Sequence, residues 1–126
     1  MQETRYFTVE EANACIPDLN IDITDLLELK DQLEELHAEL TPFLEVIPHN
    51  GGNKNALLLM QTGDKLREIV RRIERLGCHI KGLDPALIDF PHIRDGKEVY
   101  LCWRYGEKEI GYWHEIDDGF TGRKPL

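Results

Sequence analysis

The chain has 126 residues, the length of one ordinary domain built around one hydrophobic core. Its composition, 41% hydrophobic and 31% charged, is typical of a soluble globular protein and excludes an intrinsically disordered one. The formal net charge of −9 argues against binding to nucleic acid or to an anionic membrane, because a field of that sign repels phosphates.

The N-terminal stretch MQETRYFTVEE is polar and lacks the apolar segment of a signal peptide. No apolar run approaches the ~20 residues that a membrane-spanning helix needs. We therefore expect a cytoplasmic protein. Its three cysteines, Cys15, Cys78 and Cys102, follow no motif spacing and are expected to be reduced thiols.

Residues 8–76 are predicted to be helical. Thr8 followed by Glu11 forms a capping box, which predicts a short helix from Val9 to Ile16. Pro17 and Asp18 are expected to interrupt or restart this helix, because proline lacks the amide hydrogen that a helix interior uses.

A heptad-like apolar stripe then predicts a long helix ending near Leu40, before Pro42. Asp22 occupies the one slot that breaks the series. After the loop sequence PHNGGNKN, a second long helix is predicted from Asn55 to Leu76, with Gly77 as its C-cap. The two helices should form an antiparallel hairpin, and the length of the stripe predicts a coiled-coil-like homodimer through these helices. The stripe consists of Leu19, Leu26, Leu29, Leu33, Leu36, Leu40 and Phe43.

Residues 79–118 change to a period of two, which predicts an antiparallel sheet. The strand segments are LIDFPHI, EVYLCWRY and EIGYWHEI, and HIKGL is a further short candidate. Asp95–Gly96 is a hairpin turn signal, and Pro91 places its strand at a sheet edge. The tail, residues 119–126, is predicted to be irregular. The fold class is thus a single α+β domain over residues 1–126, with a helical hairpin and a three- to four-stranded sheet.

The turns predict which residues face one another across the sheet. A two- or four-residue turn centred on Gly106–Glu107 pairs Val99 with His114 and Tyr100 with Trp113. The other turn pairs further residues of the first two strands, including Asp89 with Cys102. The core face is then predicted to carry Ile88, Phe90, Val99, Leu101, Trp103, Ile110, Tyr112 and Ile116, with His92 and His114 at one end.

The opposite face is predicted to be a mixed recognition surface. Asp89, Tyr100, Cys102 and Trp113 surround a hollow above Gly111, and exposed aromatic residues mark interfaces. A face covered by the tail or by a second protomer is the alternative. Cys102 is a poor candidate nucleophile, because the neighbouring Asp89 raises the pKa of a thiol.

Two pairs of residues are candidates for metal binding. Cys102 and His114 suggest zinc, but the register above places them on opposite faces, where they cannot share an ion. His92 and His114 share the core face in that register, so they are the alternative pair for a divalent metal or for acid–base chemistry. No cofactor is predicted.

Two segments resemble the family known as domain of unknown function 2203, which groups small bacterial and archaeal proteins. They are FTVEEANACIP and the chain from Gly82 to Leu126, about half of the sequence. The resemblance implies a helical hairpin with a small sheet and implies no known activity. Its matching tail suggests that Arg123 packs back onto the sheet, pairing with Asp89 or Glu107. The matching motifs are Ile88 to Pro91, Leu101 to Arg104 with Gly106 and Glu107, Trp113–His114, Gly119–Phe120 and Gly122 to Leu126.

The function predicted best is that of a homodimeric binding module. Its partner is an unidentified protein or small molecule, and its recognition surface consists of Asp89, Tyr100, Cys102, Trp113 and Arg123. A small metal-dependent or acid–base enzyme is the alternative.

Overall fold

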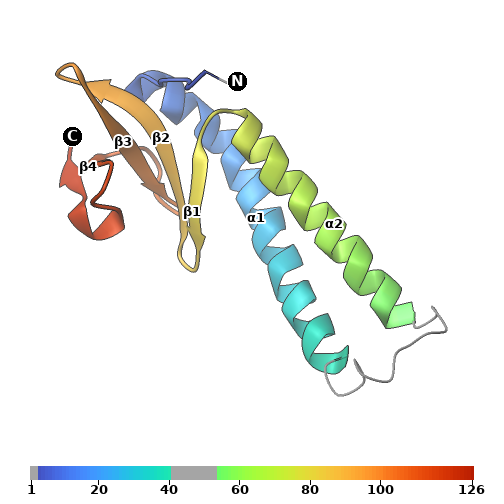
Figure 1. The fold of residues 1–126 in the computed structure, drawn as a ribbon. Coiled ribbons are helices and arrows are strands. Elements are labelled where there is room, and N and C mark those ends of the chain that lie inside the picture. Colours follow the sequence, from blue (N-terminus) through green and yellow to red (C-terminus); the bar gives the residue numbers. More distant parts are fainter. Residues whose placement is uncertain (1–2, 41–53) are drawn as a thin grey trace.

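A computed structural model describes residues 3–40 and 54–126, which form two helices and one antiparallel sheet (Figure 1). The α+β class with a helical hairpin is confirmed. The prediction of three to four strands was too low, because the sheet has five. The elements are α1 (Val9–Leu40), α2 (Lys54–Arg75), β1 (His79–Leu83), β2 (Ala86–Arg94), β3 (Lys97–Arg104), β4 (Tyr112–Glu115), the 3₁₀ helix η2 (Phe120–Gly122) and β5 (Lys124–Pro125).

Helix α1 is continuous, so the predicted interruption at Pro17 is wrong. The capping box is present: the Thr8 amide donates to Glu11 Oε1, and the Glu11 amide donates to Thr8 Oγ1. Pro17 is exposed, whereas Ile16 and Leu19 beside it are buried. Burial of these flanking side chains outweighs the one backbone hydrogen bond that Pro17 cannot make. Among the described residues, no helix is long and apolar enough to cross a membrane.

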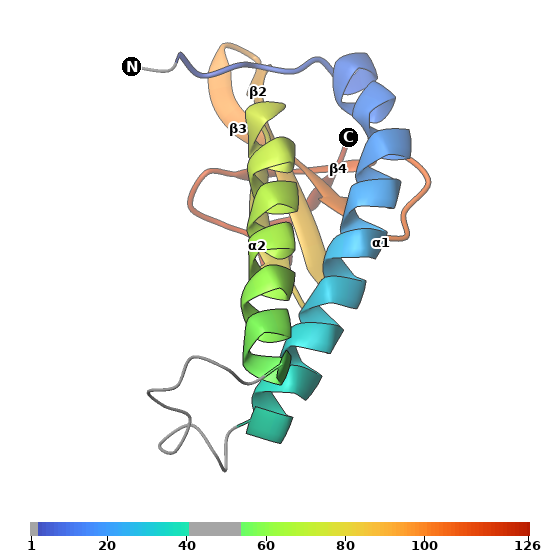
Figure 2. The same cartoon turned by 90° about the vertical axis from the view of Figure 1, so that its right-hand side faces the viewer.

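The two helices cover one face of the sheet (Figure 2). The half of the hairpin near the chain's N-terminus packs on the sheet, and the other half projects beyond it (Figure 1). This matches the burial, since Leu19, Ile23 and Leu26 are fully buried, whereas the leucines from Leu27 to Leu36 are partly exposed. The core combines these three with Ile69 and Ile73 of α2 and with Ile88, Phe90, Leu101 and Trp103 of the sheet.

Asp22, the residue that breaks the apolar stripe, connects the helices. Its side chain is buried, and its Oδ1 accepts a hydrogen bond of 2.7 Å from Nη2 of Arg72 on α2. Burying a carboxylate is costly unless it is paired, and Arg72 provides the pair. The predicted loop PHNGGNKN, like Pro42 and Phe43, lies largely outside the described residues.

The sheet has the order β1-β2-β3-β4-β5, so β2 is an interior strand and the prediction that it forms an edge is wrong. Pro91 is tolerated because β1 pairs with β2 only as far as Asp89. Beyond that point the Pro91 carbonyl accepts a hydrogen bond from the Phe7 amide, 2.8 Å away. The missing proline amide therefore leaves no gap in a ladder.

The β2–β3 register is as predicted, with Asp89 opposite Cys102 and Arg94 opposite Lys97. The Asp95–Gly96 turn has positive φ at both residues, 52° and 77°, as a type I′ turn requires.

The β3–β4 register differs by one residue from the prediction. His114 lies opposite Tyr100, and Trp113 lies opposite Leu101. A shift of one residue moves every side chain of β4 to the other face. His114 therefore leaves the core face and Trp113 joins it. Tyr112 and Ile116, which were assigned to the core, are exposed.

The tail contains two short regular elements, although it was predicted to be irregular. After β4 the chain turns back through η2 and pairs as β5 with β4. It lies on the side of the sheet away from the helices (Figure 1). Two glycines shape the turn. Gly119 has φ 68°, and a Cβ on Gly122 would lie 2.5 Å from Cβ of Asp118.

Candidate functional site

Three polar side chains from three adjacent strands meet beneath the tail. Asp89 of β2, Cys102 of β3 and His114 of β4 each offer one ligand atom, and these atoms lie within 4.8 Å of one another. All three residues are at most 2% exposed. The prediction that Cys102 and His114 lie on opposite faces is wrong, because it rested on the register that the structure shifts by one residue.

His114 is held between two hydrogen-bond acceptors. Its Nδ1 lies 2.7 Å from the Glu115 carbonyl oxygen, and its Nε2 lies 2.9 Å from Oδ2 of Asp89. A carbonyl and a carboxylate both accept, so the pair needs one proton beyond those of a neutral imidazole and a carboxylate. Either the imidazole is charged and donates from both nitrogens, or the Asp89 carboxyl donates to Nε2.

The second oxygen of Asp89 is the unusual feature. Oδ1 is buried, and no hydrogen bond from a described residue to it meets the usual limits of distance and angle. The nearest candidate donor is the Cys102 thiol, whose contact with the Asp89 carboxylate contributes to its raised pKa. A buried acceptor without a partner costs about 1–3 kcal/mol. Buried polar groups in native proteins are almost always satisfied, so this oxygen is the place in the cluster where an ordered water or a ligand group would donate.

A cavity of about 310 Å³ opens above these three residues. Its floor is Asp89, Cys102 and His114. Its walls are Lys81 and Leu87 of the sheet together with residues 116–120, where β4 leads into the tail, and these include Asp117 and Asp118. We refer to it as the sheet–tail pocket. Its volume is at the lower end of the range for small-ligand sites.

Cys102 is a thiol rather than a thiolate. Burial first, and then the negative charge of Asp89, raise its pKa to about 12. A thiol of that pKa is a weak nucleophile at neutral pH, which agrees with the prediction against cysteine catalysis.

Tyr100 flanks the site. Its ring centroid lies 5.6 Å from that of His114, and Lys81 Nζ lies 4.9 Å from the ring centre on the other side.

Two of the predicted site residues lie elsewhere. Trp113 packs against the core cluster and lies under Arg94 and Lys124, whose cationic groups are each 4.8 Å from its ring. His92 is on the core side, where its Nδ1 lies 2.7 Å from the Phe7 carbonyl oxygen. His92 and His114 therefore face opposite sides of the sheet, and they cannot form the alternative metal or acid–base pair.

Arg123 packs back onto the sheet and pairs with Glu107, which is one of the two partners that the family resemblance suggested. Its Nη2 donates to both carboxylate oxygens of Glu107, at 2.9 and 2.8 Å. The guanidinium also lies 4.0 Å from the Tyr112 ring centre and 4.8 Å from that of Phe120. Glu107 in turn accepts the Arg104 amide, so one carboxylate joins the β3 turn to the tail. Arg123 supports the wall of the pocket without lining it.

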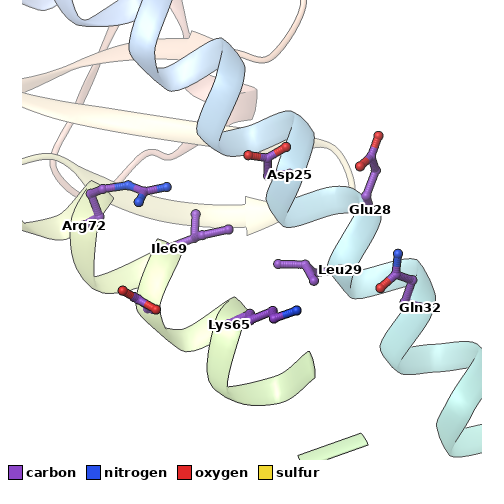
Figure 3. A pocket seen from close by; sticks show the side chains of 8 residues that line it. Asp25, Glu28, Leu29, Gln32, Lys65, Ile69 and Arg72 are labelled. Carbon is purple, nitrogen blue, oxygen red and sulfur yellow. The ribbon is translucent and has the colours of Figure 1, made fainter. Parts of the chain in front are cut away.

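A second hollow, of about 340 Å³, lies between the helices (Figure 3). Asp25, Glu28 and Gln32 of α1 face Lys65 and Arg72 of α2 across it. The charged side chains there are exposed, and among the described residues none has a buried atom without a partner. This groove is a solvated contact between helices, and the sheet–tail pocket is the better candidate.

A family model described as "Uncharacterized conserved protein (DUF2203)" matches residues 5–126. The chain belongs to this family. The match extends over the helical middle as well as the two segments whose resemblance is visible by eye. No curated protein and no solved structure is detectably similar to the chain.

Sequence reasoning missed His114 on this face, Lys81, and the part that the tail plays. Tyr112, Trp113 and His114 are all large and amphipathic, so their alternation fits either register. The pairing of Asp89 with Cys102 was predicted correctly, and it already placed two possible metal ligands side by side. That pairing was the signal that could have located the site.

Proposed function

We propose that this protein is a binding module whose recognition site is the sheet–tail pocket, and that its ligand is a small group that is cationic or donates hydrogen bonds. The observation that supports the proposal is the buried, unpartnered Oδ1 of Asp89 at the floor of the pocket. A ligand that donates to this oxygen would remove the cost of leaving it unsatisfied.

The charges around the pocket favour the same kind of ligand. Asp117 and Asp118 line its wall, Lys81 is the one lysine or arginine among the described lining residues, and the whole chain carries a net charge of −9. A negative field raises the local concentration of cations and repels anions.

The test uses methylguanidinium as the probe and maps its binding through backbone amide chemical shifts. We expect the amide shift changes to lie at Cys102, His114 and the tail. The affinity for methylguanidinium should fall about tenfold in Asp89→Asn, because a charged acceptor becomes a neutral one. The asparagine amide of this variant can still donate to neutral His114, so the fold is retained. Glu28→Gln, in the groove between the helices, is the matched control. Shifts confined to that groove, or equal affinity in Asp89→Asn, contradict the proposal.

We also propose that two copies associate through the projecting half of the hairpin. Leu57, Leu58 and Met60 at the start of α2 are 55%, 46% and 65% exposed. Helix α1 contains ten acidic residues and one lysine, whereas α2 contains six lysines and arginines and three acidic residues. Apolar side chains beside helices of opposite charge suit antiparallel packing of a second hairpin, as in a four-helix bundle.

Sedimentation tests this association. We expect a dimer whose dissociation constant rises at least tenfold in Leu57→Asp and is unchanged in Ile93→Asp, a matched change at an exposed apolar residue of the sheet. A monomer mass at every concentration contradicts the association and leaves the pocket proposal intact.

A further inference from the structure

We infer that the natural occupant of the sheet–tail pocket is a divalent metal ion of the zinc class, held by Asp89, Cys102 and His114. The inference rests on the proposed function, since it names the ligand of the same pocket. It is supported by four separate properties of these three residues: their donor types, convergence, charge and hydrogen bonds.

The donor set selects the class of ion. A thiolate and an imidazole are the ligands of zinc and similar transition metals, whereas magnesium and calcium require oxygen ligands throughout. One sulfur, one nitrogen and one carboxylate oxygen come from three neighbouring strands, so the backbone ladder holds all three positions.

The spacing is close to that of a metal site. Ligands about 2.0–2.3 Å from a tetrahedral zinc ion lie about 3.3–3.6 Å apart. Here His114 Nε2 and Asp89 Oδ2 are 2.9 Å apart, and all three ligand atoms lie within 4.8 Å of one another. The three atoms are therefore near the separations of a bound ion, and binding requires their side chains to adjust.

The charges balance when the ion binds. A carboxylate, a thiolate and a neutral imidazole together carry two negative charges, which a divalent cation neutralises inside a buried site. The ion replaces the proton shared by Asp89 and His114 and the proton of the Cys102 thiol, so binding releases two protons when both leave.

The hydrogen bonds of His114 also fit the metal-bound form, in which its imidazole is neutral. With Nδ1–H donating to the Glu115 carbonyl, the lone pair of His114 Nε2 points toward Asp89 and Cys102. A backbone carbonyl that holds the other ring nitrogen is the usual support of a metal-binding histidine. The Asp89 oxygen that lacks a partner gains one as a ligand or by facing the ion.

Among residues 3–40 and 54–126, this cluster offers three ligands, and the same three residues line the sheet–tail pocket. Structural zinc sites normally have four protein ligands, whereas three leave a position for water or a further molecule. The site is therefore of the open type, and Lys81, Asp117 and Asp118 line the pocket beside it.

The test is titration of the chelator-treated full-length protein with Co²⁺, followed by Zn²⁺. We expect one equivalent of Co²⁺ to produce the near-ultraviolet sulfur-to-cobalt absorption and the intense visible bands of tetrahedral cobalt. One equivalent of Zn²⁺ should abolish both and raise the midpoint of thermal unfolding. Cys102→Ser should lose the sulfur band, and Cys15→Ser, which changes a half-buried cysteine elsewhere, should keep it.

Amide shifts in the unmodified protein provide a second readout that does not depend on a variant's folding. Zn²⁺ should perturb the residues around His114 and leave α2 unchanged. Absence of the sulfur band in the wild type, its persistence in Cys102→Ser, or Zn²⁺ shifts at another place would each overturn the inference. If methylguanidinium still maps to the pocket in that case, the recognition site stands without the metal; if neither probe binds there, both proposals fail.

Discussion

Replacing Arg123 by alanine should release the C-terminal tail from the sheet. The lost hydrogen bonds to the Glu107 carboxylate are worth about 2 kcal/mol, within the range for charged partners. Contacts with the Tyr112 and Phe120 rings add about 1 kcal/mol. The buried Nε of Arg123 has no acceptor among the described residues. Removing this unsatisfied donor stabilises the folded tail by about 1 kcal/mol, which partly offsets the loss. The net loss is about 2 kcal/mol.

Hydrogen exchange of the tail amides measures this loss directly. The Leu126 amide donates to the Gly111 carbonyl and the Gly122 amide donates to the Gly119 carbonyl, so both are protected only while the tail is in place. A loss of about 2 kcal/mol makes their exchange about thirtyfold faster.

Arg104→Ala is the matched control for this experiment. Arg104 is exposed, and within the part of the chain that the structure describes its side chain makes one ring contact, at 6.0 Å with Phe120. Its removal should change the exchange of the tail amides less than about threefold by the same relation. Equal exchange in wild type and Arg123→Ala would show that the Glu107 pair does not hold the tail.

Three further changes follow from the fold. Gly122→Ala should loosen the tail by about 1–3 kcal/mol because its Cβ collides with Asp118, as fast exchange of the tail amides would report. Leu101→Ala, at a fully buried position, should lower the free energy of unfolding by about 2–5 kcal/mol in urea titrations; a loss under about 1 kcal/mol would contradict the assigned core. Hydrogen bonds from Thr8 lower the pKa of Glu11 below its usual 4.5, so Glu11 stabilises the protein above that pH and less as the pH falls through the lowered value. The melting temperature of Glu11→Gln should therefore lie below that of the wild type at neutral pH and approach it in acid, and a constant difference would refute the capping role.

Local patterns predicted most of the elements correctly. The capping box at Thr8, the leucine stripe and the Asp95–Gly96 turn each depend on residues close in sequence, and each is present. The β2–β3 register followed from that turn, because a two-residue turn leaves only one pairing. The contact between Arg123 and Glu107 was one of two pairings that the family resemblance suggested.

The errors arose where several local choices were nearly equal in energy. Pro17 disfavours a helix locally, but burial of the neighbouring side chains keeps α1 continuous. The turn at Gly106–Glu107 allowed two registers, and the wrong one separated Cys102 from His114. In the structure, the Arg104 amide donates to the Glu107 side chain and the Ile110 amide donates to Asn13 of α1, which together hold the chain between the strands in the other register.

The sequence by itself determined the helical hairpin, the first sheet register and the neighbourhood of Asp89 and Cys102, because short-range periodicity and turn chemistry specify them. Only the tertiary structure decided that His114 completes the cluster and that the tail covers it. Both depend on contacts between residues far apart in the chain, namely Asn13 with Ile110 and Glu107 with Arg123. A shift of one residue in β4 is nearly neutral for local propensity, yet it decides which side chains share a buried site.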